Sequence, residues 1–487
     1  MSSMSSTSAL GRDLEIGATW AAGGVLVVLL WLLLITGQVN ILCAVVVAIP
    51  LLTLAVVKRE AAVLWTLVYL VLLGDIRRVV AQIAAPGAFD PLLLVAPAVT
   101  VVLVIPVFAN LRLADPLSKA VLGLLLVMGL EVVNPRQGPI SVGLSGVFFY
   151  IVPLMWFWLG RSFGAPDLVR KIIYNVLLPL ALMAGLIGIC QTFIGFLPYQ
   201  QAWISEVGRV YTSLYVGTSV RAFGFSTSAA EYATLLEFAI SLAVAAFLAS
   251  RRSWSLAIPI LAGALLLSGG RGLTIKIVIA LPVLWLVRRG QKITVVTIAS
   301  MAVLASLALV SVSLIAGRFA SSTEGQRGSS AAQEAMSHQM GGLAHPFDEK
   351  YSSAGLHSNM VTNGFLEGFT NPLGRGLGST TFAAQKFGSD SDGGSSELDL
   401  SDMFIALGLV GGVLYFSVVV LGVRAAFRYV RTTPWQTGLP VFAILIATLG
   451  GWLIGGQYST CSVVFFLLGC VVYPGTAANT ALRQRSV

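Results

Sequence analysis

Charged residues are scarce in this chain of 487 residues. Asp, Glu, Lys and Arg make up 10% of it, whereas a soluble globular domain carries roughly 25%. Hydrophobic residues make up 56% of the chain. This shortage of charge excludes both an ordinary soluble enzyme and an intrinsically disordered chain, which is polar and rich in charge. Apolar runs of about 20 residues, the length that crosses a bilayer, recur along the sequence. The composition therefore predicts an all-α, polytopic integral membrane protein.

Cysteine and histidine are also scarce. All four cysteines fall within apolar runs and show no metal-ligand spacing, so we interpret them as small hydrophobic residues. They are Cys43, Cys190, Cys461 and Cys470. The three histidines, at positions 338, 345 and 357, match no helical spacing of metal ligands. We therefore expect neither a disulfide framework nor a zinc centre, and no metal ion or cofactor.

The apolar runs predict about 14 transmembrane helices. Their expected bounds are 17–36, 39–57, 61–75, 91–108, 117–134, 143–160, 172–194, 229–249, 254–270, 271–287, 293–316, 400–422, 438–456 and 459–477. The first run shows no evident small-residue cleavage site, so we expect a retained helix and not a signal peptide. The third run is short for a span.

The distribution of Lys and Arg between the loops predicts the orientation, because cytoplasmic loops carry an excess of these residues. When the loops are assigned alternately to the two sides, most Lys and Arg fall on the side of the N-terminal tail. Both termini, 1–16 and 478–487, are therefore expected to be cytoplasmic tails. The net charge of +9 reflects this topology, and we expect no nucleic-acid partner.

The predicted organisation has two groups of spans. Residues 17–316 contain transmembrane helices 1–11, with an outer loop near 195–228, and residues 400–477 contain helices 12–14. Between them, residues 317–399 form a large extracytoplasmic loop subdomain. This segment is too long to be a structureless loop in a compact protein, so we expect it to contain helices of its own.

Two arginines lie at the expected outer mouths of neighbouring spans. Arg271 follows the turn Ser268-Gly269-Gly270, and Arg221 lies in Arg221-Ala-Phe-Gly224-Phe225 before the eighth span. Both could be interfacial anchors that extend to lipid headgroups. Alternatively, their guanidinium groups form a clamp for a pyrophosphate at the outer leaflet, because they stay charged and match phosphate oxygens. Two such arginines together favour the clamp.

Lys276 and Glu231 are supporting candidates. Lys276 lies five residues, about 7.5 Å, deeper in the tenth span than Arg271. An ammonium group at membrane depth needs a partner. Lys276 is therefore expected to pair with a carboxylate of the eighth span, such as Glu231 or Glu237, in a structural role.

His357 lies in Gly355-Leu-His357-Ser-Asn359, within the large outer loop. A histidine there is either a satisfied structural residue or a general base or phosphate ligand.

Three other patterns carry no chemistry in our interpretation. The segment 374–378, Gly-Arg-Gly-Leu-Gly, lacks the spacing of a nucleotide loop and is interpreted as a turn that brings backbones close. Asp390-Ser-Asp392 matches the Asp-x-Asp of metal-dependent sugar transferases, but a chance match is expected in a Ser/Gly-rich stretch. Gly451-x3-Gly455 is typical of close helix packing.

Taken in order, these residues resemble the bacterial O-antigen polymerase and O-antigen ligase superfamily over about residues 140–425. The matching pieces are Gly160-Arg161, Arg221-x-x-Gly224-Phe225, Ser268-Gly-Gly-Arg271, Asn371-Pro-Leu-Gly-Arg-Gly-Leu-Gly378, Glu397-Leu-Asp399 and Leu407-Gly-Leu-Val-Gly-Gly412. The resemblance implies a metal-independent glycosyltransferase that acts on undecaprenyl-pyrophosphate-linked oligosaccharides at the periplasmic face of the bacterial inner membrane. Its expected partners are that substrate, membrane lipid and a chain-length regulator.

One departure favours the polymerase branch of the superfamily. Ligases typically place a His-Asn pair before the span that begins near 400, whereas this chain has Glu397 and Asp399 there, and His357 lies about 40 residues earlier. The expected mechanism has Arg221 and Arg271 hold the leaving pyrophosphate. His357, Glu397 and Asp399 are the candidate bases for the acceptor hydroxyl.

Two alternatives stay open. An O-antigen ligase would transfer the glycan to lipid A-core with the same arginine chemistry. A lipid-linked oligosaccharide flippase or other transporter should instead concentrate ionisable residues near the bilayer midplane.

Overall fold

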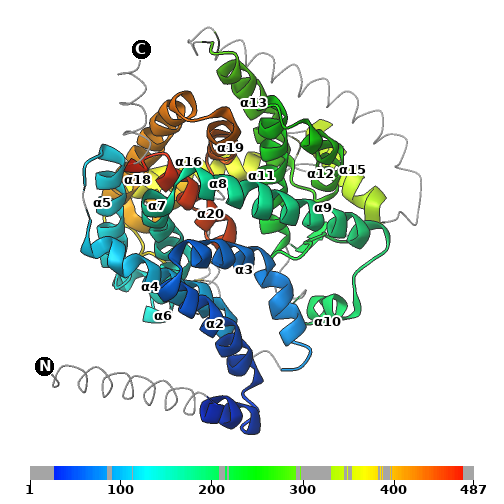
Figure 1. Ribbon diagram of the computed structural model, residues 1–487, viewed down its shortest axis with the longest axis vertical. Helices are drawn as coiled ribbons and strands as arrows, with labels where there is room; N and C mark the ends of the chain where they lie inside the picture. Colours follow the sequence, from blue (N-terminus) through cyan, green and yellow to red (C-terminus); the bar gives the residue numbers. More distant parts are fainter. Residues whose placement is uncertain are drawn as a thin grey trace, which may run out of the picture.

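The computed structural model describes residues 27–84, 90–111, 113–207, 214–216, 219–291, 297, 331–344, 348, 354–381, 384, 387, 395 and 398–474. Most of these residues are helical (Figure 1). The first part contains α2 (Val39–Val57), α3 (Arg59–Val80), α4 (Val95–Ala109), α5 (Pro116–Glu131), α6 (Ile140–Gly146), α7 (Val152–Phe163), α8 (Pro166–Lys171), α9 (Leu178–Phe193) and α10 (Pro198–Val207). Next come strands β1 (Tyr215–Val216) and β2 (Ser219–Val220), then α11 (Ala229–Leu248), α12 (Ala257–Leu267) and α13 (Arg271–Arg288). The last part contains α15 (Ala331–Ala344), α16 (Ala354–Thr370), α18 (Asp399–Thr432), α19 (Trp435–Ala447) and α20 (Tyr458–Cys470).

Among all the described residues, six helical segments are long and apolar enough to cross a membrane. They are Val39–Val57, Pro91–Ala109, Ile140–Phe163, Pro166–Phe193, Ala229–Leu248 and Asp399–Thr432. A short 3₁₀ segment leads into α4, and π-helical segments join α6 to α7 and α8 to α9. This confirms the all-α class and the membrane-crossing helices, while the expected number of spans and the orientation stay predictions.

Several expected bounds differ from the observed ones. The helix that contains the third run is longer than the run itself, because α3 has 22 residues and continues to Val80. The last two runs form shorter helices of 13 residues each, α19 and α20, since glycines at 450, 451, 455 and 456 interrupt the apolar pattern between them. The expected span 293–316 lies almost entirely outside the described residues.

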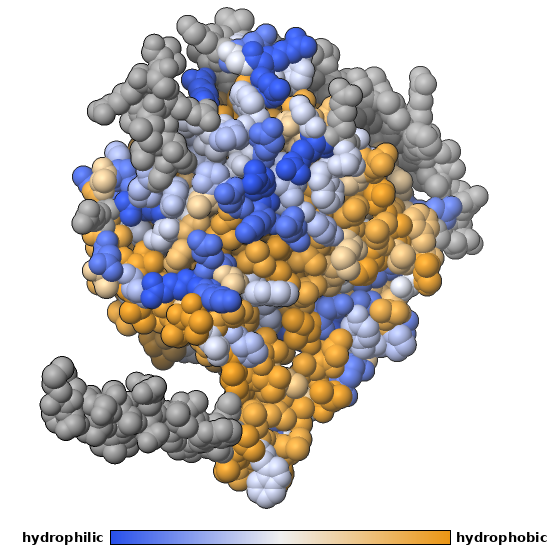
Figure 2. Space-filling model, in the orientation of Figure 1, coloured by the Kyte–Doolittle hydropathy of each residue, from blue (hydrophilic) through white to orange (hydrophobic). Residues whose placement is uncertain are grey.

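The surface has the apolar character of a protein embedded in lipid. Large hydrophobic side chains stand exposed on helices throughout the bundle, among them Ile105, Leu126, Leu130, Val410 and Phe416. In Figure 2 apolar residues cover wide continuous areas of the visible face, with hydrophilic residues gathered in its upper part. Patches of this size on a water-soluble protein would cause association, so we interpret them as the lipid-facing surface.

Glycines allow α7 and α20 to pack with their backbones in close contact (Figure 1). A side chain at Gly160 or Gly164 would collide with the backbone of α20, and one at Gly469 with the backbone of α7. Small residues are the usual means of close helix packing in membranes. Arg161, next to Gly160, lies 3.4 Å from Asp115 at the start of α5. The Gly160-Arg161 pair therefore has a structural role.

The segment 371–381 crosses α18 where that helix is broken. Gly408, inside α18, has a φ of +66°, which glycine adopts readily. The backbone N–H groups of Arg375 and Gly376 donate to the carbonyl oxygens of Ile405 and Ala406 at 2.9 and 3.0 Å. This confirms the interpretation of the glycine-rich segment as a close approach of two backbones.

The described residues of the segment 317–399 include two helices, α15 and α16, as the length of this segment predicts. Helix α16 packs on α18, where the rings of Phe365 and Phe404 lie edge to face with their centres 5.4 Å apart. Helix α15 lies on a different side of the bundle, beside α12 (Figure 1).

The interpretation of Gly451-x3-Gly455 as a helix-packing motif is wrong, because both glycines lie in the loop between α19 and α20.

Candidate functional site

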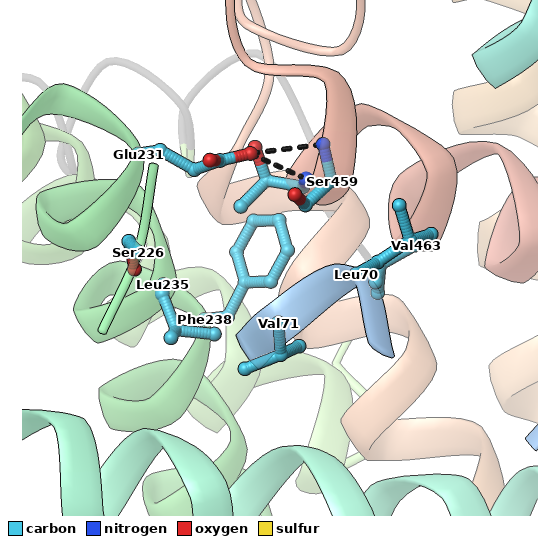
Figure 3. A pocket seen from close by; sticks show the side chains of 9 residues that line it. Leu70, Val71, Ser226, Glu231, Leu235, Phe238, Ser459 and Val463 are labelled. Atoms are coloured by element: carbon cyan, nitrogen blue, oxygen red, sulfur yellow. Dashed lines mark hydrogen bonds between the residues drawn. The ribbon is translucent and has the colours of Figure 1, made fainter. Parts of the chain in front are cut away.

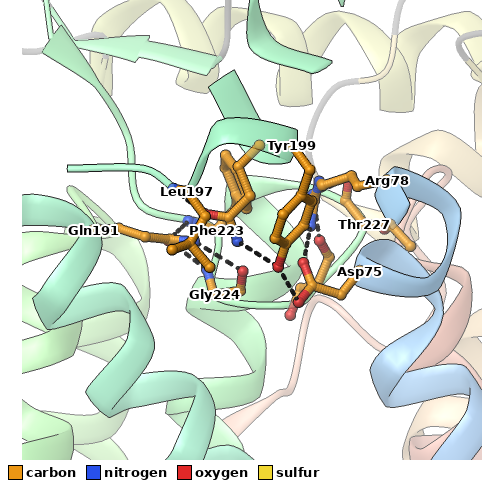
Figure 4. Close-up of polar contacts among 10 residues, drawn as sticks. Asp75, Arg78, Gln191, Leu197, Tyr199, Phe223, Gly224 and Thr227 are labelled. Carbon is orange, nitrogen blue, oxygen red and sulfur yellow. Dashed lines mark hydrogen bonds and ion pairs between the residues drawn. The ribbon is translucent and has the colours of Figure 1, made fainter. Parts of the chain in front are cut away.

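The backbone that carries Arg221 is held by Gln191 of α9. The amide oxygen of Gln191 accepts hydrogen bonds from the N–H groups of Phe223 and Gly224 at 3.1 and 2.9 Å, and its Nε2 donates to the carbonyl oxygen of Gly224 at 3.0 Å (Figure 4). Gln191 is 4% exposed. A buried amide with three hydrogen bonds to one loop fixes the path of that loop. The Arg221-x-x-Gly224 motif is thereby anchored to the helix bundle.

Helix α3 holds the other end of the same loop. Arg78, which is 1% exposed, donates to the carbonyl oxygen of Ser226 at 2.6 Å, and its guanidinium lies 4.0 Å from the ring centre of Phe223. Asp75 accepts a hydrogen bond from the hydroxyl of Tyr199 at 2.9 Å and lies 3.4 Å from Arg78 (Figure 4). Arg78 is thus a buried anchor of the loop that leads from Arg221 to α11.

Arg221 and Arg271 meet at the turn between α12 and α13. The Nε of Arg221 donates to the carbonyl oxygen of Ser268 at 3.0 Å. Gly269 has a φ of +73°, and a Cβ there would lie 3.6 Å from the Nε of Arg221. Two residues further on, Arg271 begins α13. The structure thus brings together the two arginines that the sequence indicated, from segments 50 residues apart in the chain.

Helix α15 lies over this turn and adds a histidine. Arg271 Nη2 lies 3.3 Å from His338 Nε2. A Cβ at Gly342, one helical turn further along α15, would overlap the guanidinium of Arg271, so this glycine leaves the space that Arg271 occupies. The sequence interpretation missed His338. The confinement of all three histidines to the segment 317–399 was the available signal, but no spacing rule connects position 338 to 271.

The environment of His338 is positively charged and partly shielded from water. Burial lowers the pKa of His338 below its ordinary value, and the charges of Arg271 and Arg221 lower it further. A small pocket beside Arg221 is lined by Arg221, Ser219 and Thr192, together with small and apolar side chains of the hairpin segment, α12 and α15. The hydroxyl of Ser219 donates to Glu334, which ties the β-hairpin to α15. The site is thus a positively charged group, Arg221 and Arg271, over which α15 packs.

Glu231 is engaged at a different place from the one expected. Its Oε1 accepts hydrogen bonds from the N–H groups of Ser459 at 2.8 Å and Thr460 at 3.4 Å, at the beginning of α20 (Figure 3). Its Oε2 accepts from the hydroxyl of Thr227. A carboxylate stabilises the N-terminus of a helix, where N–H groups have no partner within the helix. Pairing of Lys276 with Glu231 is therefore wrong.

Lys276 belongs to a second charged group, inside the bundle. Its ammonium interacts electrostatically with Glu237 of α11 and Asp399 of α18, and a Cβ at Gly451 would lie 3.2 Å from its Nζ. Glu237 and Asp399 are each 1% exposed. The alternative partner, Glu237, is thus the eighth-span carboxylate that Lys276 faces. Among the described residues, no salt bridge within 4 Å joins Lys276 to either acid.

The three candidate bases have different positions. Asp399 Oδ2 accepts from the Tyr415 hydroxyl at 2.5 Å and from the Trp452 N–H at 2.6 Å, so this oxygen is used to hold the loop after α19. His357 lies near the start of α16, which appears apart from α15 in Figure 1. Glu397 lies outside the described residues, as do Asp390 and Asp392. The histidine that contacts the arginine pair is His338, through Arg271.

Within the described ranges, no group of three or more His, Cys, Asp or Glu side chains is arranged to hold a metal ion. Comparison with protein-family models and with curated proteins gives no match. The functional argument therefore depends on the site itself: two arginines and a histidine, supplied by the segment after β2, by α13 and by α15. Guanidinium groups fixed in this way bind phosphate oxygens.

Proposed function

We propose that this protein is a polysaccharide polymerase, a glycosyltransferase that joins undecaprenyl-pyrophosphate-linked oligosaccharide repeats at the periplasmic face of the bacterial inner membrane. The observation that carries the proposal is that Arg221 and Arg271 lie at the same turn, residues 268–271, beneath α15. The elaborate support of the Arg221 loop by Gln191 and Arg78 is expected for a group that must be preorganised, and not for a mobile lipid anchor.

In the proposed reaction, a hydroxyl oxygen of the acceptor sugar attacks the anomeric carbon of the donor. The bond from that carbon to the pyrophosphate oxygen breaks, and its electron pair passes to the pyrophosphate. Arg221 and Arg271 stabilise the negative charge that grows there. The acceptor proton passes to a base, for which His357, Glu397 and Asp399 remain the candidates. The scheme requires no metal ion, so chelation with EDTA is expected to leave chain extension unchanged.

The test is a deletion of the gene in the organism that carries it, followed by analysis of the lipid-linked glycans. Loss of a polymerase leaves single repeats on the carrier lipid at the outer leaflet. Loss of a ligase would instead leave finished polymer on the carrier, and loss of a flippase would leave single repeats at the inner leaflet. Either of these two results contradicts the proposal. Complementation by the wild-type chain, but not by Arg271→Ala, connects the phenotype to the site.

The buried group formed by Glu237, Lys276 and Asp399 favours a second candidate, a carrier of lipid-linked oligosaccharide. Glu237 lies near the middle of α11, and ionisable residues at this depth are typical of transport pathways. In a carrier, Glu237→Gln would abolish movement of lipid-linked repeats across vesicle membranes. In a polymerase, repeats already supplied on the outer side would still be extended by the same variant.

A further inference from the structure

The contact between Arg271 and His338 determines the protonation of the histidine in this arrangement. Arg271 Nη2 lies 3.3 Å from His338 Nε2. A guanidinium only donates hydrogen bonds, so Nε2 must accept and cannot carry a proton. His338 is therefore the neutral tautomer with its proton on Nδ1.

Few other titratable groups face His338. Helix α13 contributes Arg271 and, deeper, Lys276, and Arg221 follows the hairpin. The other packed elements carry only Cys190 in α9 and Tyr215 in β1, and α12 has no titratable residue. On α15 itself, Glu334 lies one turn earlier and accepts a hydrogen bond from Ser219. Burial lowers the pKa of the imidazole, and the positive charges of Arg271 and Arg221 lower it further.

We propose that His338 is a third residue of the pyrophosphate site, and that it takes up a proton when the lipid pyrophosphate binds beside Arg221 and Arg271. This inference rests on the proposed function. His338 would act as a positioning residue for Arg271 in the arrangement seen here. With the ligand bound, Arg271 turns to a phosphate oxygen, Nε2 gains a proton from solvent, and the imidazolium donates a hydrogen bond to the ligand.

The sign of the pH dependence follows from the charges. The donor is a pyrophosphate substituted at both ends, whose negative charges do not titrate near neutral pH. Once bound, these charges offset those of Arg221 and Arg271, so the pKa of His338 rises. Between its values in the free and bound protein, binding takes up a proton and strengthens as the pH falls, by up to about tenfold for each pH unit. A site made only of arginines would bind this ligand with the same affinity across that window.

The experiment is titration calorimetry of the purified, full-length protein with farnesyl methyl pyrophosphate, a short pyrophosphate substituted at both ends. Measurements from about pH 8 to about pH 5.5, the range in which histidine titrates, in buffers of different ionisation enthalpy, count the protons taken up. We expect uptake approaching one proton for the wild type. His338→Gln keeps a hydrogen-bond acceptor but cannot titrate, so it should bind without uptake. Ser337→Ala, an exposed neighbour on α15, should behave as the wild type.

The outcomes separate the two claims. Binding by the wild type without proton uptake, or the same uptake by His338→Gln, overturns the role of His338 and leaves the pyrophosphate site intact. No binding by the wild type, or unchanged binding by Arg221→Ala and Arg271→Ala, overturns the proposed function. If His338→Gln does not fold, nitrogen-15 spectra of histidine-labelled wild type replace it. The chain has three histidines, and the pKa of one must rise on adding the ligand for the inference to stand.

Discussion

Arg221 reaches across to the turn that precedes Arg271: its Nε donates to the carbonyl oxygen of Ser268 at 3.0 Å. This hydrogen bond uses one edge of the guanidinium to fix the group against the turn. The position of Arg221 and that of Arg271 are therefore set by the same four residues, 268–271. Groups fixed relative to each other act on one ligand as a unit, so their contributions to binding and catalysis should not be independent.

Loss of either arginine should slow chain extension of purified lipid-linked repeats. Removing one preorganised donor to a developing negative charge costs about 10²–10³ in rate, so we expect this loss for Arg221→Ala and for Arg271→Ala. Arg→Lys at either position keeps the charge without the two-pronged fork and should recover only part of the rate. The double Ala variant should lose less than the product of the single losses.

A matched control is Arg77→Ala, which removes an arginine from the last turn of α3. Arg77 pairs with Asp90 at 2.5 Å in a half-exposed position, and such pairs contribute about 0–1 kcal/mol. This variant should extend chains normally. Near-normal extension by well-folded Arg221→Ala and Arg271→Ala would contradict the proposed site.

Gly342→Ala should damage the site without disturbing the helix that carries it. Alanine is a better helix former than glycine, but its Cβ would overlap the Arg271 guanidinium. Displacement of a catalytic group by about 1 Å can cost up to about 100-fold in rate. We expect a loss of this order in chain extension, with normal expression and thermal stability. Gly263→Ala on α12 meets no atom within 4 Å and should be active. Full activity of Gly342→Ala would mean that α15 does not pack on Arg271 in the working enzyme.

Local sequence signals predicted individual helices well. The expected span 39–57 coincides with α2, and the spans expected at 229 and 271 begin where α11 and α13 begin. Ser228 accepts a hydrogen bond from the Glu231 N–H at 3.1 Å, as a residue before a helix commonly does. Long apolar runs bounded by such residues leave little choice of local structure.

The lateral contacts of the site could not be predicted in the same way. His338 meets Arg271 across 67 residues of sequence, because α15 docks through small residues such as Gly342, which give no periodic signal. Glu231 was misplaced for a related reason. Its partners are backbone N–H groups of α20, and backbone groups have no sequence signature. Both contacts join residues that are far apart in the sequence, so the sequence alone does not predict them.

The orientation of the membrane domain can be tested with single cysteines in a background without Cys43 and Cys190, the two cysteines that are not buried. Ser337→Cys, exposed on α15, should react with an impermeant maleimide in intact cells. Ser253→Cys, exposed before α12, should react only after permeabilisation. The buried Cys461 should stay unlabelled in both cases and reports intact folding. Labelling of Ser337→Cys only after permeabilisation would place the arginine site at the cytoplasmic face and contradict the periplasmic polymerase.

Glu231 is predicted to stabilise the fold and to take no part in the reaction. It is 2% exposed and joins α11 to the first N–H groups of α20. Glu231→Ala leaves those buried donors without a partner, and losing a hydrogen bond to a charged group costs about 1.5–3 kcal/mol. We expect this decrease in the free energy of unfolding, measured by SDS titration in bicelles. Glu231→Gln, which keeps an acceptor oxygen, should lose less. Glu206→Gln, on an exposed position of α10, should lose no measurable stability.

At matched amounts of folded protein, all three variants should extend chains at the wild-type rate. A Glu231→Gln variant of normal stability but low activity would show instead that this carboxylate takes part in the reaction.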